Sequence, residues 1–153
     1  MDQRSSPTVY RMLRVTFGIR CSPFLAIATV QHHVKNDQEE YPVAAAQILE
    51  NMYVDDLLSG ASDDTSALKL QQDLTALMKK GGFPLTKWAS NSDYVMTNIP
   101  VENRNPAALI DSDSSRSLKA LGIVWDTNSD SFGYEVTNIM TSQTRKRSVV
   151  CLV

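Results

Sequence analysis

The sequence predicts an α+β fold, in which short antiparallel strands and helices follow one another along the chain. Three observations predict it. Two adjacent aspartates, Asp55 and Asp56, stand between apolar runs and favour a tight hairpin. Residues 62–82 carry the end signals of a helix, and residues 118–136 form apolar runs around a polar turn.

The first strand is expected at Tyr10–Val15, which alternates loosely and is stopped by Phe17 and Gly18. Ser22 and Pro23 then open a helix, because a capping hydroxyl followed by proline is typical of a first helical turn. The apolar face of this helix is Phe24, Leu25, Ile27, Ala28 and Val34.

A second helix is expected from Pro42 to Leu49, a strong helix-forming segment with proline at its start. His32 and His33 lie near the end of the first helix. We interpret them as surface or packing histidines, since no cysteine or carboxylate stands at ligand spacing from them.

The aspartate hairpin follows directly. Two ionised carboxylates are costly to bury without partners, so the apolar runs Ile48–Val54 and Leu57–Leu58 are expected to pair as strands, with the acids at the turn. A third helix comes next, capped within Ser62–Thr65 and ended by Gly81 and Gly82.

The remaining elements are a strand, a loop and a hairpin. Phe83–Ala89 is expected to be an edge strand, because its proline is tolerated there. Residues 100–117 read as a mobile loop. Residues 118–125 and 132–136 are expected to pair across a polar turn that begins at Asp126.

Composition bounds the class of protein. The chain has 153 residues, of which 42% are hydrophobic, enough for one domain with a core. No apolar run has the length of a membrane span, and no signal peptide is recognisable. Cys21 and Cys151 are the only cysteines, so we expect an intracellular chain with reduced thiols.

Charge is unevenly distributed, although the net charge is only −2. Residues 1–35 carry five basic residues and one acid, whereas residues 36–66 carry eight acids and no lysine or arginine. An acidic centre beside basic flanks suits a cation site that faces a polyanion. The alternative is that the flanks are ordinary solvated faces.

Asp55 and Asp56 are the candidate metal ligands. Neighbouring anions repel each other, and a divalent cation relieves that repulsion. Carboxylate oxygens suit Mg²⁺ or Mn²⁺. The alternative is a solvated Asp-Asp turn that joins two ordinary strands.

Several segments, in this order, resemble the palm of a reverse transcriptase, most closely that of Bel/Pao-type LTR retrotransposons. They are Val15-Thr16-Phe17-Gly18, Cys21–Ala26, Tyr53–Gly60 with its Tyr-Val-Asp-Asp motif, Gly81-Gly82-Phe83 with Leu85, Lys87–Asn91, and Leu121-Gly122 with Trp125. The resemblance runs from about Tyr10 to Val136. It implies a polymerase palm, a ferredoxin-like antiparallel sheet with packed helices.

The resemblance also implies residue roles for an RNA-directed DNA polymerase, a nucleotidyltransferase that uses two metal ions. Asp55 and Asp56 would be catalytic and hold Mg²⁺ or Mn²⁺. The residues that would position nucleotide and template are Phe17, Gly18, Ser22, Pro23, Tyr53, Val54 and Lys87, and Leu121 and Gly122 would grip the primer. Gly18 could equally be a simple turn glycine, and Lys87 a solvated lysine at a strand edge.

One departure from the family is the missing strand that carries the first catalytic aspartate. Only nine residues precede Tyr10, and Asp2 is the sole acid among them. We therefore expect residues 1–140 to be a partial palm domain and residues 141–153 to be the truncated start of the following helical segment. The other parts of the polyprotein are expected to be absent.

Three interpretations follow. The chain is a polymerase fragment, inactive alone, whose family partners are RNA/DNA primer-template and deoxynucleoside triphosphates, with no membrane. Alternatively, it is a non-catalytic remnant that binds nucleic acid or a protein, or an unfunctional translation product. Mg²⁺ binding by two carboxylates is expected to be weak. The family location is the cytoplasm or a virus-like particle.

Overall fold

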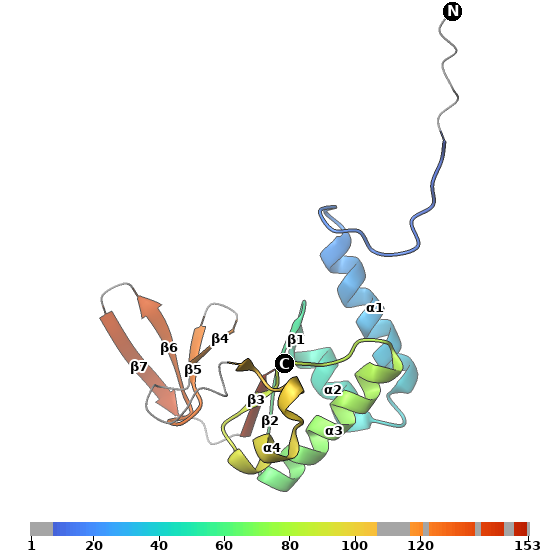
Figure 1. Cartoon of the computed structure of the whole chain (residues 1–153). Coiled ribbons are helices and arrows are strands. Elements are labelled where there is room, and N and C mark those ends of the chain that lie inside the picture. Colours follow the sequence, from blue (N-terminus) through green and yellow to red (C-terminus); the bar gives the residue numbers. More distant parts are fainter. Residues whose placement is uncertain (1–7, 107–116, 121–122, 137–138, 146–148, 153) are drawn as a thin grey trace, which may run out of the picture.

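The computed structural model describes residues 8–106, 117–120, 123–136, 139–145 and 149–152. Helices and antiparallel strands alternate along these residues, so the predicted α+β class is confirmed. The strands form two four-stranded sheets, ordered β1-β2-β8-β3 and β4-β5-β6-β7. The helices lie beside the first sheet, and the second sheet stands apart from them (Figure 1).

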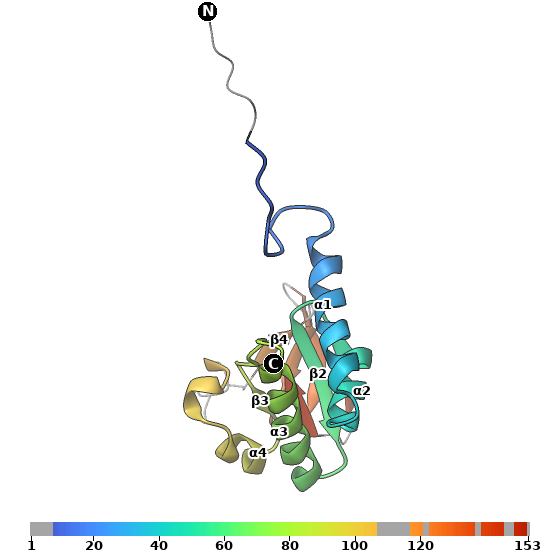
Figure 2. The ribbon, with the colours of Figure 1, turned by 90° about the vertical axis from the view of Figure 1, so that its right-hand side faces the viewer.

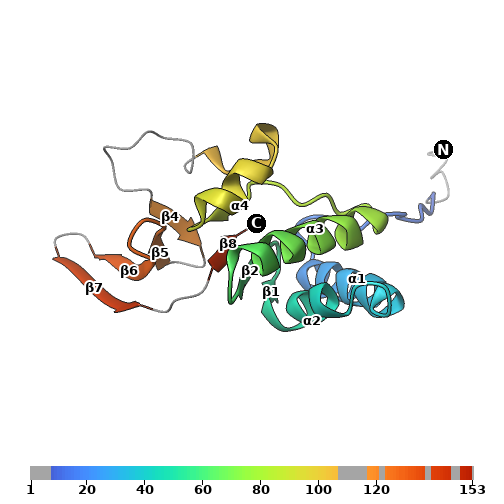
Figure 3. The same ribbon diagram turned by 90° about the horizontal axis from the view of Figure 1, so that it is seen from below.

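Three helices cover the first sheet: α1 (Ser22–Asp37), α2 (Pro42–Asn51) and α3 (Asp64–Lys80). Seen from below, they lie together on one side of β2 (Asp56–Ala61), and the second sheet lies on the other side (Figure 3). No helix in the described ranges is long and apolar enough to cross a membrane.

The predicted helix starts are close to those observed. Proline stands in the first turn of α1 and of α2. The cap of α1 is nevertheless different from the prediction, because Cys21 is the N-cap residue and Ser22 is already helical, with no side-chain cap. In α3 the cap is Asp63, whose carboxylate accepts a hydrogen bond from the Ser66 amide at 2.9 Å.

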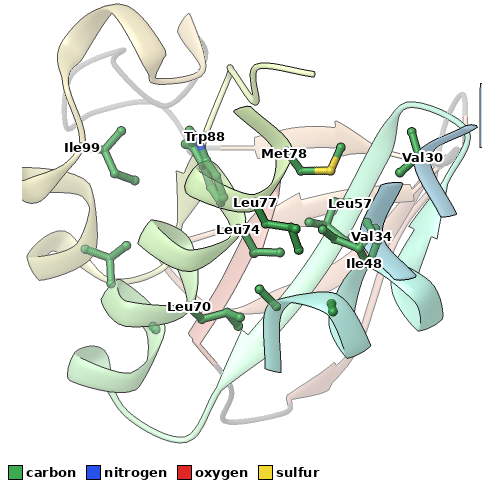
Figure 4. Close-up of a cluster of buried hydrophobic side chains, with 14 residues drawn as sticks. Val30, Val34, Ile48, Leu57, Leu70, Leu74, Leu77, Met78, Trp88 and Ile99 are labelled. Carbon is green, nitrogen blue, oxygen red and sulfur yellow. The ribbon is translucent and has the colours of Figure 1, made fainter. Parts of the chain in front are cut away.

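The core lies between α1, α2, α3 and the first sheet (Figure 4). Val34, Leu74 and Leu77 are completely buried, and Leu57 of β2 meets them from the sheet. Truncation of such a leucine to alanine costs about 2–5 kcal/mol. These side chains hold β2, the second strand of the aspartate hairpin, against the helices.

A polar cluster joins the end of α1 to the end of α3. Lys80 Nζ lies 2.5 Å from Asp37 Oδ1 and 2.7 Å from Glu40 Oε2. His33 Nε2 is 2.7 Å from the Leu77 carbonyl oxygen, and its ring packs against Phe83. His33 is thus a packing histidine, as predicted, and His32 is exposed.

The first sheet is completed by β8 (Val149–Leu152), which lies between β2 and β3 (Ala89–Ser90). Ser59 and Ser90 both pair with Cys151, from opposite sides. Residues 139–145 (β7, Ile139–Arg145) are also a strand. A helical segment was predicted here; the actual strands depend on partners that a local pattern cannot reveal.

The second sheet is a meander of β4 (Ser117–Ala120), β5 (Ile123–Asp126), β6 (Ser131–Val136) and β7. The predicted hairpin of residues 118–125 with residues 132–136 is confirmed in part: Trp125 pairs with Phe132, but residues 117–120 form a separate strand, and Asp126 belongs to β5 and not to the turn. Trp125 is fully buried against Phe132, and its indole N–H donates to Asp130 Oδ1 at 3.2 Å. This small core is shared with the first sheet, because Ala89 of β3 and Leu58 of β2 belong to the same cluster.

Three local predictions were wrong. Tyr10–Val15 forms no strand and is exposed, because no neighbouring strand lies beside it in the described residues. Of the predicted strand Phe83–Ala89, only Ala89 is in β3, with Trp88 joined to Arg104 by an isolated bridge. The predicted loop at residues 100–117 begins with a short 3-10 helix, η1 (Val101–Asn103), and its residues 107–116 lie outside the described residues; the helix before it, α4 (Asp93–Asn98), was not predicted.

Candidate functional site

The aspartate hairpin is built as β1 (Met52–Tyr53), a two-residue turn and β2. Tyr53 pairs with Asp56, so Val54 and Asp55 form the turn. The predicted hairpin is thus confirmed, with two corrections. Asp56 is the first residue of the returning strand, and Ile48 belongs to α2.

Val54 holds a left-handed backbone conformation, with φ at 56°. A β-branched residue is a true outlier there, at a cost of about 1–2 kcal/mol. Such strain persists only where the surroundings impose it, and it gathers at functional sites. The hairpin turn is therefore the one place near the two aspartates where the fold opposes local preference.

Helix α2 fixes the position of the hairpin. The amide of Met52, the first residue of β1, donates to the Ile48 carbonyl and so ends the helix. Gln47 Oε1 accepts hydrogen bonds from the Ser59 hydroxyl at 2.6 Å and from Asn51 Nδ2 at 2.7 Å. These bonds tie β2 to the helix that precedes the turn.

The space beneath the turn is small. A hollow of about 10 Å³ lies between α1, α2 and Val54, and its lining is mainly apolar. This is about the room that one water molecule needs. This hollow is too small for a nucleotide, and neither aspartate lines it. The lining residues are Ile27, Val30, Gln31, Ile48, Met52 and Val54.

The carboxylates themselves are accessible. Asp55 is exposed and Asp56 is half-buried. Among the residues that the structure describes, no group of three or more His, Cys, Asp or Glu side chains could hold a metal ion. Two carboxylates offer oxygens of the kind that Mg²⁺ prefers, but too few to replace much of its water.

Lys87 approaches the same end of the sheet as the hairpin. Leu58 and Ala89 both pair with Leu152, so β2 and β3 run parallel on either side of β8. Asp56 and Lys87 each stand two residues before those positions, but only Asp56 is part of a strand, so the register does not fix the distance between them. Lys87 is exposed, with a φ of 62°.

The other predicted positioning residues form the turn before α1. Phe17 is fully exposed, and Gly18 has a φ of 84° with open space around it. The Ser22 hydroxyl donates to the Thr16 carbonyl, and Pro23 is exposed. Figure 1 shows this segment at the N-terminal end of α1, the end toward which the β1–β2 hairpin also points.

The predicted primer-grip residues, Leu121 and Gly122, lie outside the described residues. The strands before and after them pair, with Ala120 opposite Ile123. Tyr53, the remaining predicted residue of the hairpin, is exposed beside the turn.

Sequence reasoning missed the cluster around Lys80. Hydrogen bonds from Lys80 hold the pKa values of Asp37 and Glu40 below their usual range, and the same bonds raise the pKa of Lys80. The acidic loop and the Lys79-Lys80 pair were visible separately in the sequence. Their contact depends on how α1 and α3 pack, so this cluster is a structural clamp.

Comparisons of the chain with protein-family models, with curated proteins and with solved structures found no match.

Proposed function

We propose that this chain is part of the palm of a retrotransposon RNA-directed DNA polymerase and that its hairpin contributes two of the metal-binding carboxylates. The observation that carries the proposal is the hairpin itself: an exposed Asp55 in a strained turn, followed by Asp56 at the start of β2. The ordered motifs that resemble a reverse transcriptase support it.

Each group has a role in this proposal. Asp55 and Asp56 present oxygens to divalent cations at the end of the first sheet. When bound, such ions neutralise charge on the triphosphate and activate the primer hydroxyl. Lys87, at the same end of the sheet, supplies positive charge for phosphate. Phe17, Gly18, Ser22 and Pro23 would meet template and nucleotide from the start of α1.

The carboxylates of Asp55 and Asp56 are the type of ligand that Mg²⁺ prefers, but two of them are too few for a complete site. A further carboxylate has to come from a strand that lies beside the hairpin. In the first sheet, β8 occupies the central position next to β2, where the resemblance expects the aspartate strand, and its sequence is Val-Val-Cys-Leu. The chain by itself is therefore proposed to be inactive.

Paramagnetic Mn²⁺ titration tests the metal site. In NMR spectra of the labelled chain, we expect Mn²⁺ to broaden the amide signals of residues 54–57 first, with an affinity in the millimolar range or weaker. Asp55→Asn combined with Asp56→Asn should abolish this broadening, because the substitution keeps the shape and removes the charge.

A second adjacent pair, Asp63 and Asp64, is the internal control. Asp63 is engaged in capping α3, so its carboxylate is less available to a metal. Equal broadening at both pairs would mean non-specific attraction to acidic dipeptides. Micromolar affinity would contradict an incomplete donor set and would require another acid, for which Glu50 is the nearest in sequence.

A further inference from the structure

The chain before α1 exposes an unusual amount of apolar surface. Residues 8–21, here called the N-terminal arm, contain Val9 at 91% exposure, Leu13 at 86% and a fully exposed Phe17. Large apolar groups that lie together on a surface mark an interaction site. The other exposed members are Tyr10, Met12, Val15 and Ile19, and Phe24 and Leu25 continue the surface onto α1.

A defined turn directs the arm away from the rest of the molecule. The Ser22 hydroxyl donates to the Thr16 carbonyl, and the Ser22 amide donates to the Ile19 carbonyl at 3.1 Å. Gly18, with a φ of 84°, permits the reversal. Two perpendicular views show the arm rising from the end of α1 (Figures 1 and 2). The arm thus extends away from the helical layer.

The side chains of the arm indicate the class of that molecule. From Leu13 to Phe17 apolar side chains alternate with Arg14 and Thr16, so this part of the arm would have one apolar face if it paired as a strand, although Tyr10 and Met12 lie at the opposite positions. Apart from Tyr10 and Phe17, the exposed apolar side chains of the arm are not aromatic and cannot stack on bases. An apolar protein surface is therefore a better cover than a nucleic acid.

The positive charge of the arm indicates that the protein surface covering it is acidic. The arm carries Arg11, Arg14 and Arg20 and no acid. The arms of two copies would repel each other, so the arm of one copy does not pair with the arm of another.

The surface around β1 has the complementary properties. β1 lies at the edge of its sheet, and Tyr53 and Val54 are exposed there. Glu50, Asp55 and Asp56 surround it, and no lysine or arginine occurs between residues 36 and 68. Sheet edges readily accept an added strand.

We propose that the chain forms a dimer in which the arm of each copy docks along the β1 edge of a second copy. Arg11 and Arg14 meet Glu50 and Asp55, and the apolar face covers Tyr53 and Val54. Three aromatic side chains per copy, Tyr10, Phe17 and Phe24, bury about 150–250 Å² each, or roughly 900–1,500 Å² for two copies. A stable interface needs about 1,200–2,000 Å².

Sedimentation velocity of the complete, nuclease-treated chain tests the dimer. We expect a dimer that dissociates on dilution into the low micromolar range. Leu13→Asp combined with Phe17→Asp should weaken association at least about tenfold, as loss of an interface anchor does. Both side chains are exposed, so the circular dichroism spectrum should not change, and neither should the thermal midpoint at a concentration where both proteins are monomeric. Val43→Asp, at an exposed apolar site on α2, is the matched control and should leave the dimer intact.

A charge exchange tests which surfaces meet. One variant carries Arg11→Glu and Arg14→Glu, so its arm and its edge are both acidic. The other carries Glu50→Arg and Asp55→Arg, so both are basic. Each alone should be monomeric, and the mixture should form a heterodimer in which both contacts are restored.

Four results would overturn the proposal. The first is a monomer at about 100 μM, which is far above the expected micromolar dissociation constant. The second is association that the arm substitutions leave unchanged, and the third is a mixture of the two charge variants that stays monomeric. The fourth is association that nuclease treatment removes. The last would assign the arm to nucleic acid.

Discussion

Gly81, at the end of α3, has no side chain, and this leaves room for His33 of α1 to pack against it. A β-carbon placed on this residue would lie 2.4 Å from His33 Cδ2, although its backbone is conformationally ordinary for any residue. Its neighbour Gly82 has open space but a φ of 78°. Adjacent glycines are thus required for different reasons, one for space and one for backbone conformation.

We predict that Gly81→Ala lowers the free energy of unfolding by about 1–3 kcal/mol, because His33 has to leave its place against the Leu77 carbonyl. Gly82→Ala should cost about 1–2 kcal/mol through backbone strain. Urea unfolding measures both. In a His33→Ala background the cost of Gly81→Ala should largely disappear while that of Gly82→Ala persists. Equal costs in both backgrounds would contradict the steric account.

At the scale of elements, the Lys80 clamp joins α1 to α3. Folding lowers the pKa values of Asp37 and Glu40 from ordinary values of 3.8 and 4.5. A lowered carboxyl pKa gives stability that is present above the ordinary pKa and is lost as the pH falls through the folded one. Lys80 has a raised pKa, so its contribution is present below its ordinary value of 10.5.

Lys80→Met should therefore lower the thermal midpoint at pH 7 and lose this effect in acid. We expect the midpoints of the wild type and the variant to converge as the pH falls below about 3. Lys79→Met, at the exposed neighbouring position, is the control and should change neither value. If the thermal midpoints of the wild type and Lys80→Met differ by the same amount at pH 7 and in acid, the loss of stability comes from packing of the lysine side chain over Tyr41 and not from its charge.

At the scale of the whole molecule, the proposed function depends on groups that the described chain does not bring together. We predict that the purified chain does not extend a primer on an RNA template with Mg²⁺ or Mn²⁺ and all four deoxynucleotides. Catalysis needs reacting groups in register, and an error of about 1 Å can cost on the order of 10²-fold. Extension that Asp55→Asn abolishes would refute this prediction and require a third carboxylate within the chain.

Local signals predicted α1, α2, α3 and the aspartate hairpin, because proline, capping residues and glycine act within a few positions. Ser92 also accepts a hydrogen bond from the Val95 amide at 3.3 Å, a cap that could have revealed α4. The strands of residues 139–152 could not be predicted, since their pairing is decided by distant partners. For the same reason the sequence located Asp55 and Asp56 but could not divide them between turn and strand.

The central position of β8 has a consequence for protein synthesis. Helices α1 to α3 can pack as soon as residue 80 has emerged, but the edges of β2 and β3 that face each other stay unpaired until residues 149–152 arrive. At about 5–20 residues per second, the roughly 70 residues of this interval take about 4–14 s. During that time a growing chain carries two open strand edges beside a formed helical layer, which is the kind of surface that chaperones hold and that neighbouring nascent chains can capture.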